Sequence, residues 1–336
     1  MSDRASTRLV LLGTAGGPLP SPARAGIAQA IAVGGRTYLV DCGSGVTTQL
    51  RRARLLSGLH RVFVTHLHSD HVCDYFHLFW LGWPVLQWNP PVRVFGPGPA
   101  GGAAALPPDD PARPPVPLVG AAHPTPGILE LTERLMAAAA YDVNIRMREA
   151  GRRDLTALVA PSAVEVPPGL GAAGPDRVAP DMEPVLVAED DDVRVTATLV
   201  RHAPVFPAFA YRLDTDAGSV VVSGDTAPSP NLVRLARGAD VLVHEVYDDG
   251  GDRDDDDAGA DDEERWEAAR RHHHLTTSHT GLSRVGAVAA EAGVRRLVLT
   301  HFVPGDDVLA DEHWLKGVRD FDGEVVVGRD LLELPL

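Results

Sequence analysis

The chain has 336 residues, of which 44% are hydrophobic and 23% are charged, with a formal net charge of −15. This composition can form an ordinary hydrophobic core and excludes global disorder. No apolar run approaches the roughly 18 residues of a membrane span, and Leu9–Leu12 is too short for a signal peptide. Two cysteines cannot form a disulfide scaffold. We therefore expect a cytoplasmic protein without membrane contact.

The negative charge is concentrated in one segment. Residues 248–264 contain eleven acidic residues and one arginine, a net charge of −10. We expect a solvated loop there. Clustered positive charge, which nucleic-acid binding requires, is lacking. We therefore do not expect a nucleic-acid partner.

Strands and helices are predicted in two similar series. In the first, the pattern indicates strands over 8–12, 27–33, 37–40, 61–65 and 92–95, with helices over 46–56 and 72–83. A loop over 97–126, a helix over 128–150 and a second loop over 160–184 follow. The second series has strands over 185–188, 193–200, 208–214, 219–223, 241–244 and 296–300, with helices over 230–237, 263–273 and 282–292. This order predicts a layered α/β structure of two halves.

The strongest chemical signal is a cluster of potential metal ligands directly after the strand over 61–65. His66, His68, Asp70 and His71 fall within six residues. Imidazole and carboxylate suit zinc and similar divalent ions. On extended chain, residues two apart face the same way, so His66 and His68 can bind one ion. If a helix then begins, Asp70 and His71 can face a second ion.

Three later residues occupy matching positions at predicted strand ends. His202, Asp225 and His301 each follow such a strand. Functional sites of α/β proteins tend to lie at these ends. With the first cluster they give seven candidate ligands, five histidines and two aspartates.

These motifs resemble those of the metallo-β-lactamase superfamily, within its ribonuclease Z and bacterial arylsulfatase-type branch. The matching pieces are Leu12-Gly13-Thr14, Leu39-Val40-Asp41-Cys42-Gly43, Thr65-His66-Leu67-His68-Ser69-Asp70-His71, Ser223-Gly224-Asp225-Thr226, Val243-His244-Glu245, Ser278-His279-Thr280 and Leu299-Thr300-His301-Phe302. The resemblance implies an α/β (α+β) fold, an αββα sandwich. It would form a single domain over 1–336, with a helical and loop insert over about 97–184, between His71 and His202.

The resemblance also implies a site for two divalent metal ions, zinc above manganese or iron. His66, His68 and His202 would hold one ion, and Asp70, His71 and His301 the other, with Asp225 and a hydroxide bridging them. Two cations lower the pKa of the bridging water and stabilise charge on the substrate oxygen. Asp41 and Thr65 are candidates to orient the ligands.

Three residues are the expected catalytic set: Asp70, His279 and Glu245. In the family, the histidine that matches His279 faces the scissile ester and can give a proton to the leaving group. Glu245 matches the acidic residue that orients it. The run His272–His274 is instead expected to be solvated at a helix end.

The expected reaction is the hydrolysis of a small phosphate or sulfate ester by the bridging hydroxide. Ribonuclease Z usually carries a basic arm for tRNA, and in many bacterial members it lies between the third histidine ligand and the bridging aspartate. Here that interval, from His202 to Asp225, is only 23 residues. A tRNA 3′-end endoribonuclease is therefore the alternative, and a lactone or acyl hydrolase or a ligand sensor is a further one. Family members commonly dimerise, and the insert between His71 and His202 could supply the interface of a homodimer.

Overall fold

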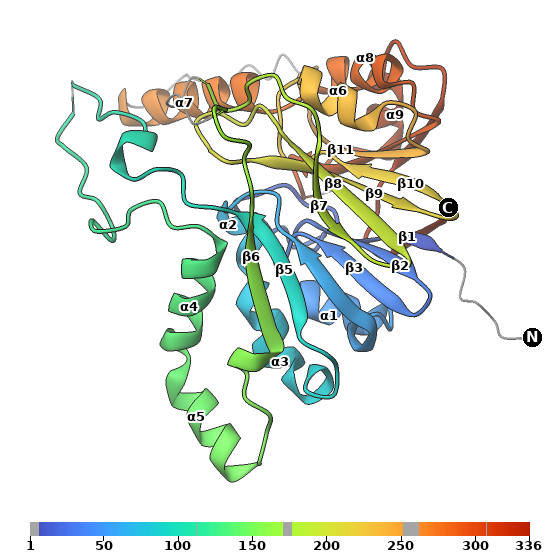
Figure 1. Ribbon diagram of the computed structural model, residues 1–336. Coiled ribbons are helices and arrows are strands. Elements are labelled where there is room, and N and C mark those ends of the chain that lie inside the picture. The colour runs from blue at the N-terminus through green and yellow to red at the C-terminus, as the bar shows by residue number, and fades with distance from the viewer. Residues whose placement is uncertain (1–6, 112, 171–176, 251–261, 307) are drawn as a thin grey trace, which may run out of the picture.

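Two mixed β-sheets face each other at the centre of the molecule. The computed structural model describes residues 7–111, 113–170, 177–250, 262–306 and 308–336. Within these ranges, each sheet has seven strands, in the orders β14-β1-β2-β3-β4-β5-β6 and β13-β12-β11-β10-β9-β8-β7. Helices cover the outer face of each sheet (Figure 1). The predicted αββα sandwich is confirmed.

The first sheet comes mostly from the N-terminal half of the chain. Its strands are β1 (Arg8–Gly13), β2 (Ala28–Val33), β3 (Arg36–Val40), β4 (Leu59–Phe63), β5 (Val92–Pro97), β6 (Val159–Val164) and β14 (Leu332–Pro335). The strands β14, β1, β2 and β3 pair antiparallel, whereas β3 to β6 pair parallel. Strands β2 and β3 form a hairpin, which turns at Gly34 and Gly35 with φ of 56° and 87°.

The second sheet repeats this plan. Its strands are β7 (Val185–Glu189), β8 (Val193–Leu199), β9 (Phe209–Thr215), β10 (Gly218–Val222), β11 (Val241–Tyr247), β12 (Arg296–Val303) and β13 (Glu324–Val327). The strands β7 to β10 pair antiparallel and β10 to β13 pair parallel. The two halves that the element order predicts therefore share one pairing pattern.

Three layers of hydrophobic core hold the sheets and helices together. Along β1, Leu9 and Leu11 belong to the core between the sheets, while Val10 and Leu12 belong to the core under the first helix layer. A strand that is apolar on both faces is typical of a central strand covered on both sides. The third core joins the second sheet to its helices. The helices are α1 (Val46–Arg52), α2 (Ser69–Val72), α3 (Tyr75–Leu86), α4 (Ile128–Ala138), α5 (Ala140–Glu149), α6 (Pro230–Ala236), α7 (Asp262–Ser278), α8 (Leu282–Ala292) and α9 (Asp311–Gly317).

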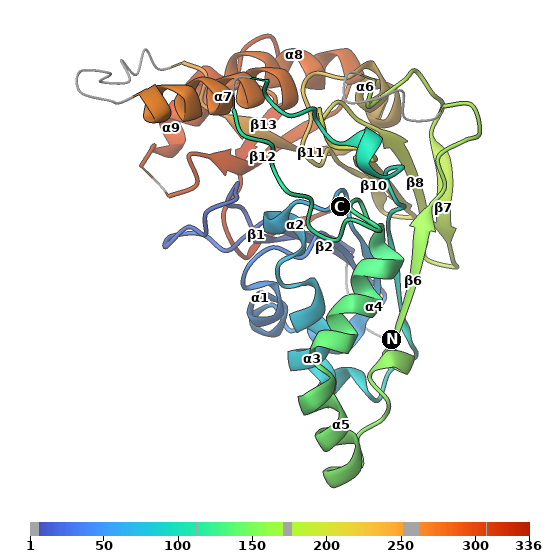
Figure 2. The same ribbon diagram turned by 90° about the vertical axis from the view of Figure 1, so that its left-hand side faces the viewer.

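Several predicted elements have different bounds in the structure. The helix expected over 128–150 is two helices, α4 and α5, which break at Ala139 and project from the body (Figures 1 and 2). The loop expected over 160–184 contains most of β6, which pairs with β5 at the edge of the first sheet. Helix α7 extends to Ser278, five residues beyond its predicted end.

Two further points concern regions of unusual composition. Most of the acidic segment 248–264 lies outside the described residues, because 251–261 are not among them. Within the described ranges, no helix combines the length and apolar character needed to cross a membrane.

Candidate metal centre

The loop after β4 carries the first four candidate ligands. The strand runs from Leu59 to Phe63, and its buried continuation ends at His66. His68 is extended, with φ of −66° and ψ of 151°, and forms the N-cap of α2. Asp70 and His71 lie on this helix and belong to a different group of possible ligands from His66 and His68. The chain thus changes from extended to helical within this motif, three residues before the start of the helix expected over 72–83.

The three distant candidates are delivered by the second sheet. His202 follows β8 and Asp225 follows β10. His301 lies inside β12, which continues to Val303, and its φ is 47°. The register between β11 and β12 shifts at this point, so His301 is the extra residue of a β-bulge. A bulge redirects a side chain that would otherwise follow the alternation of the strand.

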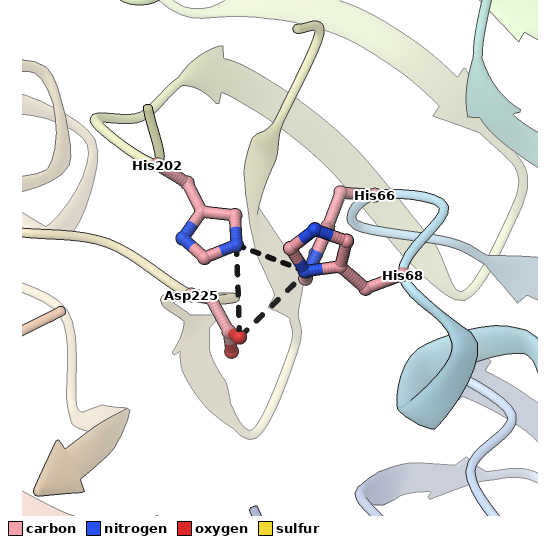
Figure 3. A group of neighbouring side chains, drawn as sticks. All are labelled: His66, His68, His202 and Asp225. Atoms are coloured by element: carbon pink, nitrogen blue, oxygen red, sulfur yellow. Dashed lines mark hydrogen bonds and ion pairs between the residues drawn. The ribbon is translucent and has the colours of Figure 1, made fainter. Parts of the chain in front are cut away.

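The first group consists of His66, His68, His202 and Asp225 (Figure 3). Their ligand atoms lie within 4.8 Å of one another. The Nε2 atoms of His66 and His202 are 3.8 Å and 4.0 Å from Oδ2 of Asp225. The Nδ1 atom of His68 lies 3.1 Å from Nε2 of His202. The four side chains thus converge from three separate segments.

The second group consists of Asp70, His71, His301 and again Asp225. The Nε2 atoms of His71 and His301 are 3.3 Å and 3.4 Å from Oδ1 of Asp225. The same two nitrogens are 3.5 Å and 3.3 Å from Oδ2 of Asp70. Asp225 therefore presents one carboxylate oxygen to each group, as a bridging ligand would.

The donor atoms fit divalent cations. Nε2 of His66 and Oδ1 of Asp225 are buried and, within the described part of the chain, have no hydrogen-bond partner. Burial holds the pKa values of His66 and His202 well below the ordinary value, so both are neutral, the form that binds metal. Burial also opposes charge on His71 and His301, but the surrounding carboxylates, of which Asp225 contributes most, together outweigh it and raise their pKa values. Positive charge is favoured between these carboxylates.

Hydrogen bonds behind the ligands fix their orientation. Nδ1 of His71 donates to Oδ2 of Asp41 at 2.8 Å, and the backbone N–H and hydroxyl of Thr65 donate to the same carboxylate. Nδ1 of His202 donates to the carbonyl of Ser278 at 3.0 Å. These bonds leave Nε2 of His202 facing the first ligand group and Nε2 of His71 facing the second. Asp41 and Thr65 lie where we expected orienting residues, whereas Ser278 acts through its backbone carbonyl and was not expected to orient a ligand.

The glycine-rich segment after β1 allows close approach to this centre. A Cβ atom at Gly17 would lie 2.3 Å from Cβ of Asp70. Any larger residue there would displace the Asp70 carboxylate. The close approach to Asp70 therefore explains why position 17 is a glycine.

His279 and Glu245 form a buried pair beside both groups. Nδ1 of His279 lies 2.8 Å from Oε2 of Glu245 and 3.9 Å from Oδ2 of Asp225. Burial disfavours a charged His279, but the attraction of Glu245 and their hydrogen bond outweigh it and raise the pKa of His279 to about 9. Glu245 also accepts a bond from the Thr226 N–H, which fixes its carboxylate. The arrangement leaves Nε2 of His279 free of Glu245.

His274 also lies at the site, although its place in a run of three histidines predicted a solvated side chain. Its Nε2 atom lies 3.3 Å from Nε2 of His279, and its ring is 5.5 Å from that of His202. His272 and His273 are exposed as expected, but His274 is half-buried and burial lowers its pKa to about 4. Because α7 continues past the predicted end, this side chain lies on the helix face that packs over the site.

The fold and these motifs agree with the comparison of the chain with protein families. The model of the metallo-beta-lactamase superfamily matches residues 27–271. The chain belongs to this superfamily, and we assign it to the metallo-β-lactamase hydrolases.

Similar proteins cover nearly the full chain. Ribonuclease Z of Mycobacterium bovis (strain BCG / Pasteur 1173P2) is 31% identical over 328 residues, and ribonuclease Z of Mycobacterium avium (strain 104) is 33% identical over 328 residues; each alignment covers 96% of both proteins. Among solved structures, the short form of human tRNase Z has a TM-score of 0.60 at 20% identity and covers 97% of this chain and 98% of its own. The metallo-beta-lactamase fold protein YhfI from Bacillus subtilis has a TM-score of 0.60 at 17% identity, covering 98% and 99%. These structures support the fold.

The expectation of a small-molecule ester substrate and no nucleic-acid partner is wrong. The relatives that match 96% of the chain are named as ribonucleases. The expectation rested on the net charge and on the short interval between His202 and Asp225. Net charge describes the whole chain, and here most of it lies in one segment. It therefore says little about the surface beside the metal centre.

Proposed function

We propose that the protein is an endoribonuclease of the ribonuclease Z type, which cleaves precursor tRNA at its 3′ end. The observation that carries the proposal is the match to ribonucleases Z over 96% of both chains, together with two ligand groups that share Asp225. Seven ligands and the Glu245–His279 pair support catalysis over a purely ligand-binding role.

We propose that the centre holds two zinc ions. His66, His68 and His202 would hold one, Asp70, His71 and His301 would hold the other, and Asp225 would be shared between them. When bound, the ions supply an activated water and Lewis acidity toward a phosphoryl oxygen. Asp41 and Thr65 keep the ligand atoms aimed at the ions.

His279 is the residue proposed to handle the proton of the leaving group. Hydrolysis breaks the bond between phosphorus and a ribose oxygen, and this oxygen needs a proton as it leaves. Nδ1 of His279 is bonded to Glu245, so Nε2 is the atom that can donate. Glu245 holds the ring in this orientation and favours the charged form.

The second half of helix α7 carries two arginines close in sequence to His274. Arg270 and Arg271 are exposed on α7, four and three residues before His274, respectively. The interaction of arginine with phosphate supplies most of the sequence-independent affinity of proteins for RNA. The second half of α7 is therefore suited to contact the RNA backbone near the cleavage site.

The test uses a precursor tRNA that carries a 3′ trailer and protein purified without added metal. We expect near two zinc ions per chain by elemental analysis and one cut that releases the trailer. His68→Ala should lower the rate at least 100-fold, while Asp216→Asn, at an exposed turn, should not change it. Absence of cleavage after reconstitution with zinc, manganese or iron would contradict the proposed reaction.

The two-ion proposal has its own test. Asp225→Ala should lower metal content and activity together, because this residue faces both groups. Retention of two ions per chain in the variant would contradict the bridging role.

A further inference from the structure

A cavity of about 360 Å³ opens directly beside the metal centre. His68 belongs both to the first ligand group and to the wall of this cavity. Leu67, which lines it, lies between two candidate ligands, and the wall segment 204–207 begins two residues after His202. The chain segments that position the ligands therefore also position the cavity.

The first part of the insert, which lies between β5 and α4, completes the wall. In both views this segment runs toward α7 and back to α4 (Figures 1 and 2). Arg113 of the insert lies over the ring of Trp266 on α7, 3.6 Å from its centroid. The insert contributes Ala105 and Leu106 to the cavity. It is thus held between α7 and α4 at the entrance of the site.

The chemistry of the wall selects the class of ligand. Apolar side chains from these three segments and from α4 line it, including Leu67, Leu106, Leu131, Val205 and Phe206. Each of these five is only half-buried, so a continuous apolar surface remains in contact with water. Such a surface next to a catalytic centre is typical of a ligand pocket.

Polar groups in the cavity are few. Among the described residues that line it, His68 and Thr125 alone have polar side chains, and neither Arg, Lys, Asp nor Glu is present. The hydroxyl of Thr125 already accepts a hydrogen bond from the Gly102 N–H at 2.9 Å. The wall therefore suits neither a phosphate nor a carboxylate, and it offers little hydrogen-bond recognition.

We infer that this cavity binds the base of a nucleotide that flanks the scissile phosphodiester bond, an inference that rests on the ribonuclease function proposed above. A base presents two apolar faces and is attached one ribose away from the phosphate. The volume lies at the lower end of the roughly 300–1,000 Å³ of small-ligand pockets, which suits a single unstacked nucleoside and excludes a duplex. Single-stranded RNA is commonly recognised by bases that stack on aromatic and apolar side chains.

The lack of hydrogen-bonding groups also predicts how selective the pocket is. Stacking is tolerant of base identity because every base has a flat face. We therefore expect the presence of a base to matter much more than which base it is.

The experiment compares precursor tRNAs in which one nucleotide on either side of the cleaved bond is replaced by an abasic ribonucleotide. With the wild-type holoenzyme, we expect one abasic position to lower kcat/KM on the order of 10-fold, the size typical for loss of one stacked base. Exchange among the four bases at this position should change kcat/KM less than about 3-fold.

Two neighbouring residues provide a matched pair of variants. Ala105→Trp places a large side chain in the cavity, whereas Ala104→Trp makes the same change at an exposed neighbour that does not line it. We expect Ala105→Trp to lower kcat/KM for the RNA with all its bases and to have little further effect on the abasic RNA. Ala104→Trp should behave like the wild type. Metal content and Tm show whether each variant is folded.

The outcomes separate the two proposals. If the wild-type enzyme releases the trailer but neither abasic substitution nor Ala105→Trp changes kcat/KM by more than 2-fold, the cavity inference is wrong and the proposed function stands. If the folded, metal-loaded enzyme releases no trailer from any precursor, the proposed function fails and the inference fails with it. Should Ala105→Trp be unfolded, Leu106→Ala, which enlarges the cavity, takes its place: weaker dependence on the base is expected, and unchanged dependence overturns the inference.

Discussion

His279 and Glu245 form a hydrogen bond of 2.8 Å in which both side chains are buried. Glu245 lies on the interior strand β11, and His279 lies on the turn between α7 and α8, so the bond joins the second sheet to its helix layer at the metal centre. The carboxylate both orients the ring and stabilises its positive charge.

Glu245→Gln tests this relationship, because it keeps the size of the side chain and removes its charge. We expect kcat for precursor tRNA to fall on the order of 100-fold, the lower range for loss of general acid catalysis, with KM changed much less. Metal content should stay the same, since Glu245 is outside the proposed ligand set. Glu291→Gln, at an exposed position of α8, is the control. A variant that loses metal along with activity would indicate a structural role instead.

A second prediction concerns Asp41, which accepts the hydrogen bond from Nδ1 of His71. Asp41→Asn should weaken zinc binding about 10–100-fold, as is typical when the carboxylate behind a histidine ligand is lost. The measurement is zinc affinity by competition with a chelator. Asp216→Asn should bind zinc like the wild type. Equal affinity of both variants would rule out an orienting role for Asp41.

A third prediction concerns His274. His274→Ala removes the only described side chain with a hydrogen bond to Nε2 of His279, the atom proposed to donate a proton. We expect kcat for precursor tRNA to fall about 10-fold while zinc affinity is unchanged. His273→Ala, one residue away and exposed, serves as the control. If both variants behave alike, His274 has no separate function.

The ligand residues were predictable because the pattern is local. Four of the seven candidates fall within six residues after one strand, and the other three follow or end predicted strands. Strands of both sheets end next to the metal centre, which brings these residues together. The bulge at His301 was not predictable, since one extra residue leaves no mark on the apolar pattern of β12.

The features that the sequence did not indicate are set by where helices and strands begin and end. Three consecutive histidines look alike in sequence, and only the extension of α7 to Ser278 shows that His274 turns toward the site. The strand β6 was missed because Pro161 interrupts it; an edge strand tolerates proline because one side of its backbone is unpaired. The break at Ala139 has neither glycine nor proline to signal it.

The final prediction addresses the contact between the two sheets at Asp190, in the turn from β7 to β8. Its carboxylate accepts hydrogen bonds from the hydroxyl of Tyr38 at 3.0 Å and pairs with Arg61 at 2.8 Å, both from the first sheet. Burial alone would raise the pKa of Asp190, but the backbone N–H groups of Asp192 and Val193, with Arg61, outweigh it and lower the pKa. The folded state therefore binds this proton less readily than the unfolded state.

The lowered pKa of Asp190 determines how its contribution to the free energy of unfolding depends on pH. A carboxyl group whose pKa is lower in the folded state stabilises the fold above its unfolded pKa, about 3.9, and this contribution is lost as the pH falls through the folded pKa. At pH 7 we expect Asp190→Asn to reduce the free energy of unfolding by about 1–3 kcal/mol. Below pH 4 the difference from the wild type should shrink, because the wild-type carboxylate also becomes neutral. Urea denaturation with chelator present at both pH values measures this without a contribution from metal release.

Asp214→Asn, which breaks a partly exposed pair with Arg212, should cost less than about 1 kcal/mol at pH 7. A difference for Asp190→Asn that is equal at pH 7 and below pH 4 would mean that shape, not charge, accounts for the role of Asp190 between the sheets.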